Sequence, residues 1–374
     1  MTGISTTGIH GANELSRVTD VAPPINVSTT FRYLDNPKEW VPADQIAEDF
    51  LLTAEPVYSR LAHSNSTQVE SIIGKITGAN AVVYNSGLSA IFAALTHLNP
   101  KQIAIGLAYH GTHGIANIFT RINGLKQLSI KDDLEKIGKG DIIYLETPVN
   151  PIGEVYDIQY YADKAHEKGA ILIVDSTFAP PPLQDPFKFG ADFVVHSATK
   201  FFGGHPDLLA GILLTKDKKA QVSLINDRVY LGTNIANLES FLLIRSLRTY
   251  ELRILQQSKN ATALVKYLND NRDKFPVIKK ITHGSLQTED YVKKQHPNGH
   301  SPVFSIELDT EEHAKYLPTK SEYFHHATSL GGVESLIEWR AMSDADCSKT
   351  LLRVSVGAEN IEDLIADFEQ GLKF

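Results

Sequence analysis

Short runs of apolar, mostly β-branched residues recur along the first two thirds of the chain, and each run turns abruptly polar at its end. The runs are Ala81–Tyr84, Gln102–Ile105, Ile142–Leu145, Ile171–Val174, Phe193–Val195 and Ala210–Thr215. Such continuous apolar runs are typical of parallel strands buried on both faces. Segments with helical spacing, such as 67–78, 89–95 and 158–168, separate them. This alternation predicts a doubly wound, mostly parallel α/β sheet.

The pattern changes at both ends of this region. Residues 1–57 contain many turn-forming residues and predict an extended arm with at most short helices, which would contribute to a neighbouring subunit. Beyond Gly232, the spacing predicts one long amphipathic helix from about Leu238 to Leu268, followed by a mixed region that ends in a helix capped by Asn360. We therefore expect a central α/β domain at 58–245 and a smaller C-terminal α+β domain at 246–374.

Composition narrows the class of protein. The chain has 374 residues and a net charge of −8 with both signs interspersed, which favours a small-molecule ligand over a nucleic acid or an anionic membrane. Its single cysteine, the absence of an apolar signal core near the N-terminus and the absence of a membrane-length run predict a cytoplasmic protein. The fourteen histidines do not form a recognisable zinc motif, so we expect no metal site.

Two of the apolar runs carry candidate chemistry. Asp175 follows the run 171–174, and Lys200 follows the run 193–195 within Ser197-Ala-Thr-Lys-Phe-Phe-Gly-Gly204. Parallel strands open their carboxyl ends on a ligand crevice, so both side chains would face it. A carboxylate there keeps a pyridine nitrogen protonated, and a lysine amine shielded by apolar and small neighbours forms a Schiff base with an aldehyde, the requirements for holding pyridoxal 5′-phosphate (PLP). Taken singly, each residue would read as an ordinary strand end or surface lysine.

A phosphate cradle is also predicted. The run 81–84 leads through Asn85-Ser-Gly-Leu88 directly into a helix. The N–H groups of Gly87 and Leu88 would lie at the positive end of the helix dipole, and Ser197 and Thr199 would add hydroxyl donors.

In these segments the chain resembles the PLP-dependent transsulfuration enzymes of cysteine and methionine metabolism, a family that includes cystathionine β-lyase, cystathionine γ-synthase, cystathionine γ-lyase and methionine γ-lyase. The resemblance covers nearly the whole chain and rests on ordered motifs: Tyr58-Ser-Arg60, Ser86-Gly-Leu88, Tyr109-His-Gly-Thr112, Glu146-Thr-Pro-Val-Asn-Pro151, Val174-Asp-Ser-Thr-Phe178, His196-Ser-Ala-Thr-Lys-Phe-Phe-Gly-Gly-His205, Ser329-Leu-Gly-Gly-Val-Glu-Ser335 and Leu352-Arg-Val-Ser-Val-Gly357. It implies the fold-type I PLP-dependent transferase fold, which is aspartate-aminotransferase-like.

The resemblance also implies roles. Lys200 would be the Schiff-base lysine and the base that moves the Cα proton, and Asp175 would pair with the pyridinium nitrogen. Gly87, Leu88, Ser197 and Thr199 would bind the cofactor phosphate of their own subunit. Tyr58 and Arg60 would reach the phosphate in a neighbouring subunit, making a dimer the catalytic unit of a homo-oligomer, expected to be a tetramer.

The remaining roles concern the substrate, a small sulfur amino acid. Tyr109 would stack on the cofactor ring and stand where a leaving group needs a proton. Asn150 and Arg353 would hold the substrate carboxylate, the arginine as a bidentate fork, and Ser329 would steer the lysine.

Departures from the family pattern bear on the reaction. Thr328 stands where members that handle the γ-carbon side of cystathionine tend to carry a glutamate, although another acid such as Glu55 could replace it. The segment Glu338-Trp-Arg-Ala-Met342 replaces a longer family segment, and Trp339 and Arg340 could reshape the substrate entrance. We therefore expect a carbon–sulfur lyase of the cystathionine β-lyase kind. The alternatives are γ-replacement on an O-acyl-homoserine by a cystathionine γ-synthase-like enzyme, a lysine Schiff-base aldolase without PLP, and a cofactor-free scaffold or interaction protein.

Overall fold

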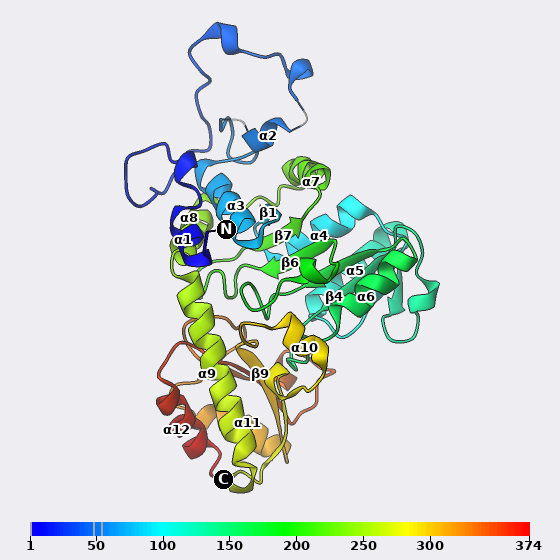
Figure 1. The fold of residues 1–374 in the computed structure, drawn as a ribbon, viewed down its shortest axis with the longest axis vertical. Coiled ribbons are helices and arrows are strands. Elements are labelled where there is room, and N and C mark those ends of the chain that lie inside the picture. Colours follow the sequence, from blue (N-terminus) through cyan, green and yellow to red (C-terminus); the bar gives the residue numbers. More distant parts are fainter. Residues whose placement is uncertain (1, 48, 54) are drawn as a thin grey trace.

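The computed structural model describes residues 2–47, 49–53 and 55–374. Its N-terminal part contains helix α1 (Ile4–His10), helix α2 (Phe50–Thr53) and short 3₁₀ turns. Between α1 and α2 the chain loops away from the rest of the molecule, where apolar side chains such as Val21, Val27 and Tyr33 are exposed (Figure 1).

A seven-stranded sheet lies in the middle of Figure 1, between the N-terminal segment above it and the C-terminal region below it. Its strands are β1 (Asn80–Tyr84), β2 (Gln102–Ile105), β3 (Lys126–Ser129), β4 (Ile142–Glu146), β5 (Ile171–Asp175), β6 (Phe193–Ser197) and β7 (Gly211–Thr215), in the order β1-β7-β6-β5-β4-β2-β3. Strand β7 runs antiparallel to both of its neighbours, and the other pairs are parallel. The predicted doubly wound, mostly parallel sheet is confirmed.

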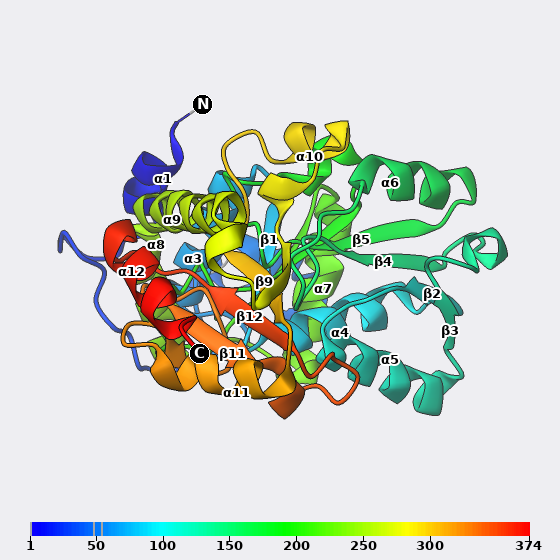
Figure 2. The same ribbon diagram turned by 90° about the horizontal axis from the view of Figure 1, so that it is seen from below.

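Helices cover both faces of this sheet, as the alternation of apolar strands and amphipathic segments requires (Figure 2). One face packs on α3 (Ser64–Thr77), α6 (Ile158–Glu167) and α8 (Asn237–Leu247), and the other on α4 (Gly87–Leu98), α5 (His110–Asn123) and α7 (Lys218–Leu231). Side chains alternate along each strand: Ile143 and Leu145 enter the first core, and Ile142 and Tyr144 enter the second.

The expectation of one helix over 238–268 is wrong. Helix α8 ends at Leu247, and a separate helix, α9 (Tyr250–Asp270), begins three residues later. The break is held by Arg253, whose buried guanidinium donates hydrogen bonds to the carbonyl of Ser246 (2.7 Å) and to that of Phe201 (3.0 Å). Tyr250 is fully buried, and its hydroxyl donates to the carbonyl of Pro181. Tertiary contacts therefore redirect the chain where the apolar spacing continues.

The C-terminal region is a second sheet of five strands with helices packed on it, as predicted for an α+β domain. Its strands are β8 (Ile278–Thr282), β9 (Val303–Leu308), β10 (His325–His326), β11 (Leu336–Trp339) and β12 (Leu351–Ser355), in the order β10-β11-β12-β9-β8. Its helices are α10 (Asp290–Gln295), α11 (Glu311–Lys320) and α12 (Ile361–Gly371), and α9 connects the two halves (Figure 1). The expected domain boundary at 245 falls inside α8.

Short 3₁₀ helices complete the elements: Asn13–Leu15, Pro37–Glu39, Ala43–Gln45, Leu134–Lys136, Pro186–Phe189, Arg272–Lys274, Gly284–Leu286 and Arg340–Met342. Within the described ranges, none of the helices is both long enough and apolar enough to cross a bilayer. The same residues contain no group of three or more His, Cys, Asp or Glu side chains arranged to hold a metal ion.

Two buried histidines, His283 and His296, lie in hydrogen-bond networks of the C-terminal region, and that of His296 reaches the strand ends of the first sheet. His296 Nε2 lies 2.9 Å from Gln184 Oε1, and the Gln184 amide donates to the carbonyl of Thr147 and to the hydroxyl of Ser176, just beyond β4 and β5. His283 Nε2 lies 2.7 Å from the carbonyl of Ser301. Burial lowers the pKa of His296 to about 3 and that of His283 to about 4.

These histidines predict acid lability. A histidine in an unfolded chain has a pKa near 6.5. Below that pH, the unfolded chain binds protons at these histidines, whereas the folded chain does not until the pH reaches their lower pKa. The free energy of unfolding therefore falls as the pH falls. Between pH 6.5 and 4.5, His283 should account for a loss of about 2 kcal/mol in the free energy of unfolding. We expect His283→Gln to flatten the fall measured by urea titration at both pH values, whereas the exposed-site control His326→Gln should not. An unchanged slope in the His283 variant would contradict this.

Candidate active site

A cleft of about 380 Å³ opens where the carboxyl ends of β4, β5 and β6 meet the first turn of α4. The predicted site residues lie together in its wall, except for Tyr58 and Arg60. The predicted residues that line the wall are Gly87, Leu88, Tyr109, Asn150, Asp175, Ser197, Thr199, Lys200, Ser329 and Arg353. The large sheet supplies one wall, and residues 328–353 of the C-terminal region supply the other. This volume lies within the range of about 300–1,000 Å³ that is usual for small-molecule sites.

Asp175 ends β5 as a buried carboxylate, only 7% exposed. Its Oδ1 accepts hydrogen bonds from the amide (3.0 Å) and hydroxyl (2.6 Å) of Thr177, and its Oδ2 accepts one from the Tyr144 hydroxyl (3.1 Å). Burial raises the pKa of Asp175, although these hydrogen bonds oppose the shift. A cation placed beside this carboxylate would restore its charge.

Lys200 follows β6, and its Nζ donates a 2.7 Å hydrogen bond to Ser329 Oγ. Burial lowers the pKa of this amine to about 8, and the nearby Arg353 adds to the shift. The amine is therefore available as a nucleophile and base near neutral pH.

The loop that carries Ser329 packs tightly on the lysine backbone. Ser329 has a φ of 77°, in the left-handed region, and Gly331 follows with a φ of 85°. A Cβ on Gly331 would lie 2.8 Å from the backbone nitrogen of Phe201, so a side chain there would push the loop away from Lys200. The Ser329-Leu-Gly-Gly motif thus fixes the Ser329 hydroxyl against the amine.

The segment predicted to cradle a phosphate is a strand that turns directly into a helix, and its role in phosphate binding remains a prediction. Helix α4 begins at Gly87, and its first intrahelical bond runs from Ala90 back to Ser86, so the N–H groups of Gly87 and Leu88 have no intrahelical partner. A Cβ on Gly87 would lie 3.1 Å from the Ser197 side chain. Glycine therefore lets the helix terminus approach the end of β6, where Ser197 lies.

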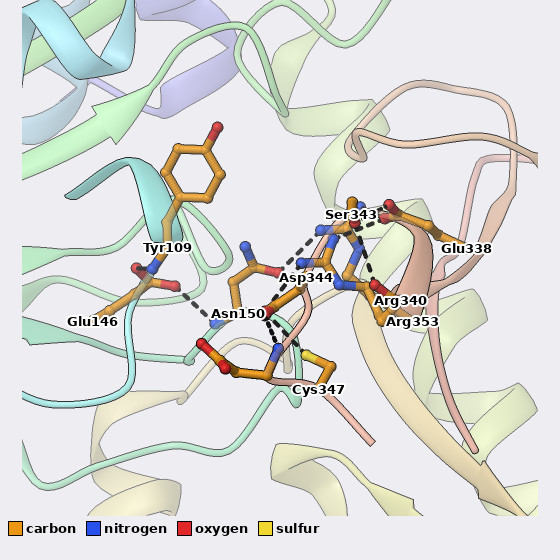
Figure 3. Close-up of polar contacts among 10 residues, drawn as sticks. Tyr109, Glu146, Asn150, Glu338, Arg340, Ser343, Asp344, Cys347 and Arg353 are labelled. Carbon is orange, nitrogen blue, oxygen red and sulfur yellow. Dashed lines mark hydrogen bonds and ion pairs between the residues drawn. The ribbon is translucent and has the colours of Figure 1, made fainter. Parts of the chain in front are cut away.

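Arg353 lies in β12, and its side chain forms part of the cleft wall (Figure 3). Its Nη1 donates to Asn150 Oδ1 (3.0 Å), and its Nη2 donates to the carbonyl of Ser329 (2.9 Å) and to Glu338 Oε2 (2.5 Å). Burial lowers its pKa to about 10, and Glu338 opposes the shift. Asn150 and Arg353, predicted to act together, are in direct contact.

Sequence reasoning missed Glu146. Its buried carboxylate accepts the backbone N–H of Tyr109 (2.8 Å) on one oxygen and that of Asn150 (2.7 Å) on the other (Figure 3). Glu146 ends β4 directly beside Asp175 of β5. Burial, together with the Asp175 charge, raises the pKa of Glu146 to about 8. The signal was present, because Glu146 follows an apolar run in the same way as Asp175.

Tyr58 and Arg60 lie in the described part of the chain but outside this cleft. Arg60 Nη1 donates to the carbonyl of Val229 (2.9 Å), and its guanidinium lies 5.5 Å from the centre of the Tyr58 ring. Their predicted contact with a neighbouring subunit remains a prediction. Glu55, considered as a replacement acid, is paired with Arg17 and does not line the cleft.

The C-terminal wall also contains residues without an assigned role. Thr328, Arg340 and Ser343 line the cleft, whereas Trp339 does not and donates its indole N–H to the carbonyl of Lys349 (2.8 Å). Departures from the family pattern pointed to Thr328, Trp339 and Arg340, but not to Ser343 or to the contacts that these side chains make.

Comparisons with known proteins show which family the chain matches. The model of a family described as Cys/Met metabolism PLP-dependent enzyme matches residues 5–373. The chain is 33% identical to a cystathionine γ-synthase of Escherichia coli (97% of this chain, 96% of the relative) and 32% identical to a cystathionine β-lyase of Lactococcus lactis (100% of both). It superposes on the crystal structure of a methionine γ-lyase from Micromonospora echinospora with a TM-score of 0.87 and 29% identity, covering 99% of both chains.

Glu146 gives a test of the site's construction. In Glu146→Gln, one of the two backbone N–H groups would face an amide NH₂ in place of an acceptor, which should lower the free energy of unfolding by about 1–3 kcal/mol. Urea unfolding at pH 9 measures this, because the pKa of Glu146 is about 8 and its carboxyl group is mostly ionised at that pH. The exposed-site variant Glu167→Gln should change stability by less than about 0.5 kcal/mol. Equal stabilities of the two variants would show that the paired acceptors do not matter.

Proposed function

Since the chain belongs to the PLP-dependent enzymes of cysteine and methionine metabolism, we propose that it is a carbon–sulfur lyase that cleaves a sulfur amino acid in the manner of a cystathionine β-lyase. Its cofactor is pyridoxal 5′-phosphate. The observation that carries the proposal is the pairing of a partly buried Lys200 amine with Ser329 in the same cleft as Asp175.

The residues present fit the cofactor. Close packing of Gly87 on Ser197 leaves the first N–H groups of α4 for a phosphate, and Asp175 supplies the carboxylate for a pyridinium nitrogen. When bound, the cofactor accepts the electron pair that the Cα–H bond leaves behind. Asp175 supports this by holding the ring nitrogen protonated, which in turn keeps the buried carboxylate ionised.

The side chains divide the remaining work. Arg353 and Asn150 hold the substrate carboxylate, and Lys200, as the neutral amine, takes the Cα proton. The carbon–sulfur bond then breaks with its electron pair on sulfur, and Tyr109 or Lys200 returns a proton to the thiolate. Tyr109 is suited to this because its backbone is anchored by Glu146 while its side chain is 38% exposed in the cleft. Water then hydrolyses the released product to a 2-oxo acid and ammonia.

Thr328 favours the lyase over the synthase. It lines the cleft at the position where an acid for a distal ammonium group was expected, and it brings no charge. The second candidate, γ-replacement on an O-acyl-homoserine, is favoured by the similar identity to a cystathionine γ-synthase. The two reactions differ in whether a second amino acid intercepts the bound product of the first half-reaction.

Product analysis separates these functions. We expect the purified, PLP-loaded protein to convert cystathionine to a thiol, a 2-oxo acid and ammonia, identified by mass spectrometry, with Lys200→Ala slower by at least about 100-fold. O-acyl-homoserine with cysteine should give little cystathionine. Cystathionine as the main product of that mixture would establish the synthase instead. If the protein turned over neither cystathionine, cysteine and methionine nor the mixture, the result would favour the cofactor-free scaffold or interaction protein.

A second prediction concerns assembly. We propose that the enzyme is a homo-oligomer in which Tyr58 and Arg60 complete a neighbour's phosphate site, which fits their position outside their own cleft. Arg60→Ala should weaken PLP affinity. Mixing it with Lys200→Ala should restore up to about a quarter of wild-type activity, since each mixed dimer has one intact site. Subunit exchange without recovery, shown by mass spectrometry of tagged chains, would refute the shared site.

A further inference from the structure

Arg340 is a second buried arginine in the substrate wall. It begins the short 3₁₀ helix Arg340–Met342 that follows β11, is 3% exposed and lines the same cleft as Arg353. Figure 3 shows the Arg340 and Arg353 side chains together, between Asn150 and Glu338. None of the roles argued above uses Arg340.

One carboxylate serves both guanidinium groups. Glu338 Oε2 accepts from Arg353 Nη2 (2.5 Å) and from Arg340 Nη1 (3.0 Å), while its Oε1 accepts from the Ser343 hydroxyl (2.6 Å). Although burial alone would raise the pKa of Glu338, Arg353, Ser343 and Arg340 bring it below its ordinary value. Glu338 therefore carries a full negative charge at neutral pH.

That charge creates a problem for substrate binding. With Glu338 alone beside it, Arg353 would present a neutral pair to an incoming carboxylate, and the electrostatic attraction would largely cancel. Arg340 restores a net positive charge to the trio. Asp344 offsets it only in part, because its carboxylate lies 3.6 Å from Arg340 Nη2, is 24% exposed and also accepts from the thiol of Cys347.

Hydrogen bonding supports the same reading. The buried Nε of Arg340 has no hydrogen-bond partner among the residues that the structure describes. A purely structural arginine, buried to this degree, would be expected to use its donors on the protein. Because the two guanidinium groups share one oxygen of Glu338, they stand side by side, and a carboxylate that binds Arg353 lies within reach of the field of both.

We infer that Arg340 is a second cationic specificity residue for the α-carboxylate of the amino-acid substrate, acting with Arg353 by offsetting Glu338. The inference rests on the proposed function only in taking the ligand to be an amino acid. It holds for the lyase and the synthase alike.

The test compares ligands that differ only in the carboxylate. L-norleucine has no carbon–sulfur bond to break, and pentylamine is the same molecule without its carboxylate. Their dissociation constants for the PLP-loaded enzyme are measured from the change in the cofactor's absorption spectrum. We expect Arg340→Met to weaken norleucine about tenfold while leaving pentylamine within about twofold, a selective loss that follows from removing a charged partner. Arg340→Lys should recover part of the affinity.

Controls separate carboxylate recognition from folding. Arg353→Met should show the same selective loss, larger in size, and the exposed-site variant Arg121→Met should show none. Arg340→Gln, which keeps polarity and bulk without the charge, serves as a second variant whose selectivity must fall in the same way. The readout needs no turnover, so a protein that fails the product assay still reports on this inference.

Three outcomes would overturn it. Equal weakening of norleucine and pentylamine would assign Arg340 a structural role. Unchanged affinity for norleucine would remove Arg340 from carboxylate binding. Weakening confined to L-2-aminoadipate, which carries a second carboxylate at its far end, would show that Arg340 binds a distal anion instead.

Discussion

The parallel register of β4 and β5 is the constraint on which the site depends. It places Glu146 beside Asp175 at the same edge of the sheet, so two carboxylates are buried within one cleft. Burial raises the pKa of both carboxyl groups, and the charge of Asp175 raises that of Glu146 further, so the ionised form of each needs hydrogen-bond donors or a cation beside it. The surroundings meet this demand differently. Asp175 is surrounded by hydroxyl donors and opens on the cleft, where a ring nitrogen can pair with it, whereas Glu146 receives two backbone N–H groups and becomes an internal anchor.

In the opposite wall of the cleft, the buried charges are two arginines, Arg340 and Arg353, held by one carboxylate, Glu338. In its proposed role, Arg353 must be held in a fixed orientation to bind a carboxylate, and hydrogen bonds to Glu338, Asn150 and the carbonyl of Ser329 hold it. Because Glu338 is itself negatively charged, it weakens the attraction of Arg353 for a substrate carboxylate. We infer that the positive charge of Arg340 offsets this loss. Lys200 lies close enough to Arg353 for that positive charge to lower the pKa of its amine further, so substrate recognition and the reactivity of the lysine are electrostatically linked.

Sequence patterns predicted what is local and repeated. The strands were found because buried parallel strands read as apolar runs, and the polar residue after each run marked Asp175 and Lys200. The apolar pattern did not predict the break between α8 and α9 at Arg248–Thr249. The break depends on the hydrogen bonds of Arg253 to the carbonyls of Ser246 and Phe201, and helical periodicity carries no information about these contacts. The roles of Glu146 and Arg340 also depend on contacts to backbone N–H groups and to a shared carboxylate. These become visible only once segments far apart in the sequence are placed side by side.

The relatives carry the names of different reactions at nearly equal identity, and the division of the cleft suggests why the scaffold permits this. Under the proposed function, the sheet side, with Gly87, Asp175, Ser197 and Lys200, handles the chemistry that every reaction of the family shares. Residues 328–353 come from the second region and form the opposite wall of the cleft, which the substrate would meet. The contacts of this wall to the sheet side include Ser329 to Lys200, Val333 to Gly204 and Arg353 to Asn150, so changes of charge between these contacts need not disturb the strand ends. Selectivity in this chain is therefore to be sought in Thr328 and Arg340, two cleft-lining residues at which the sequence departs from the family pattern.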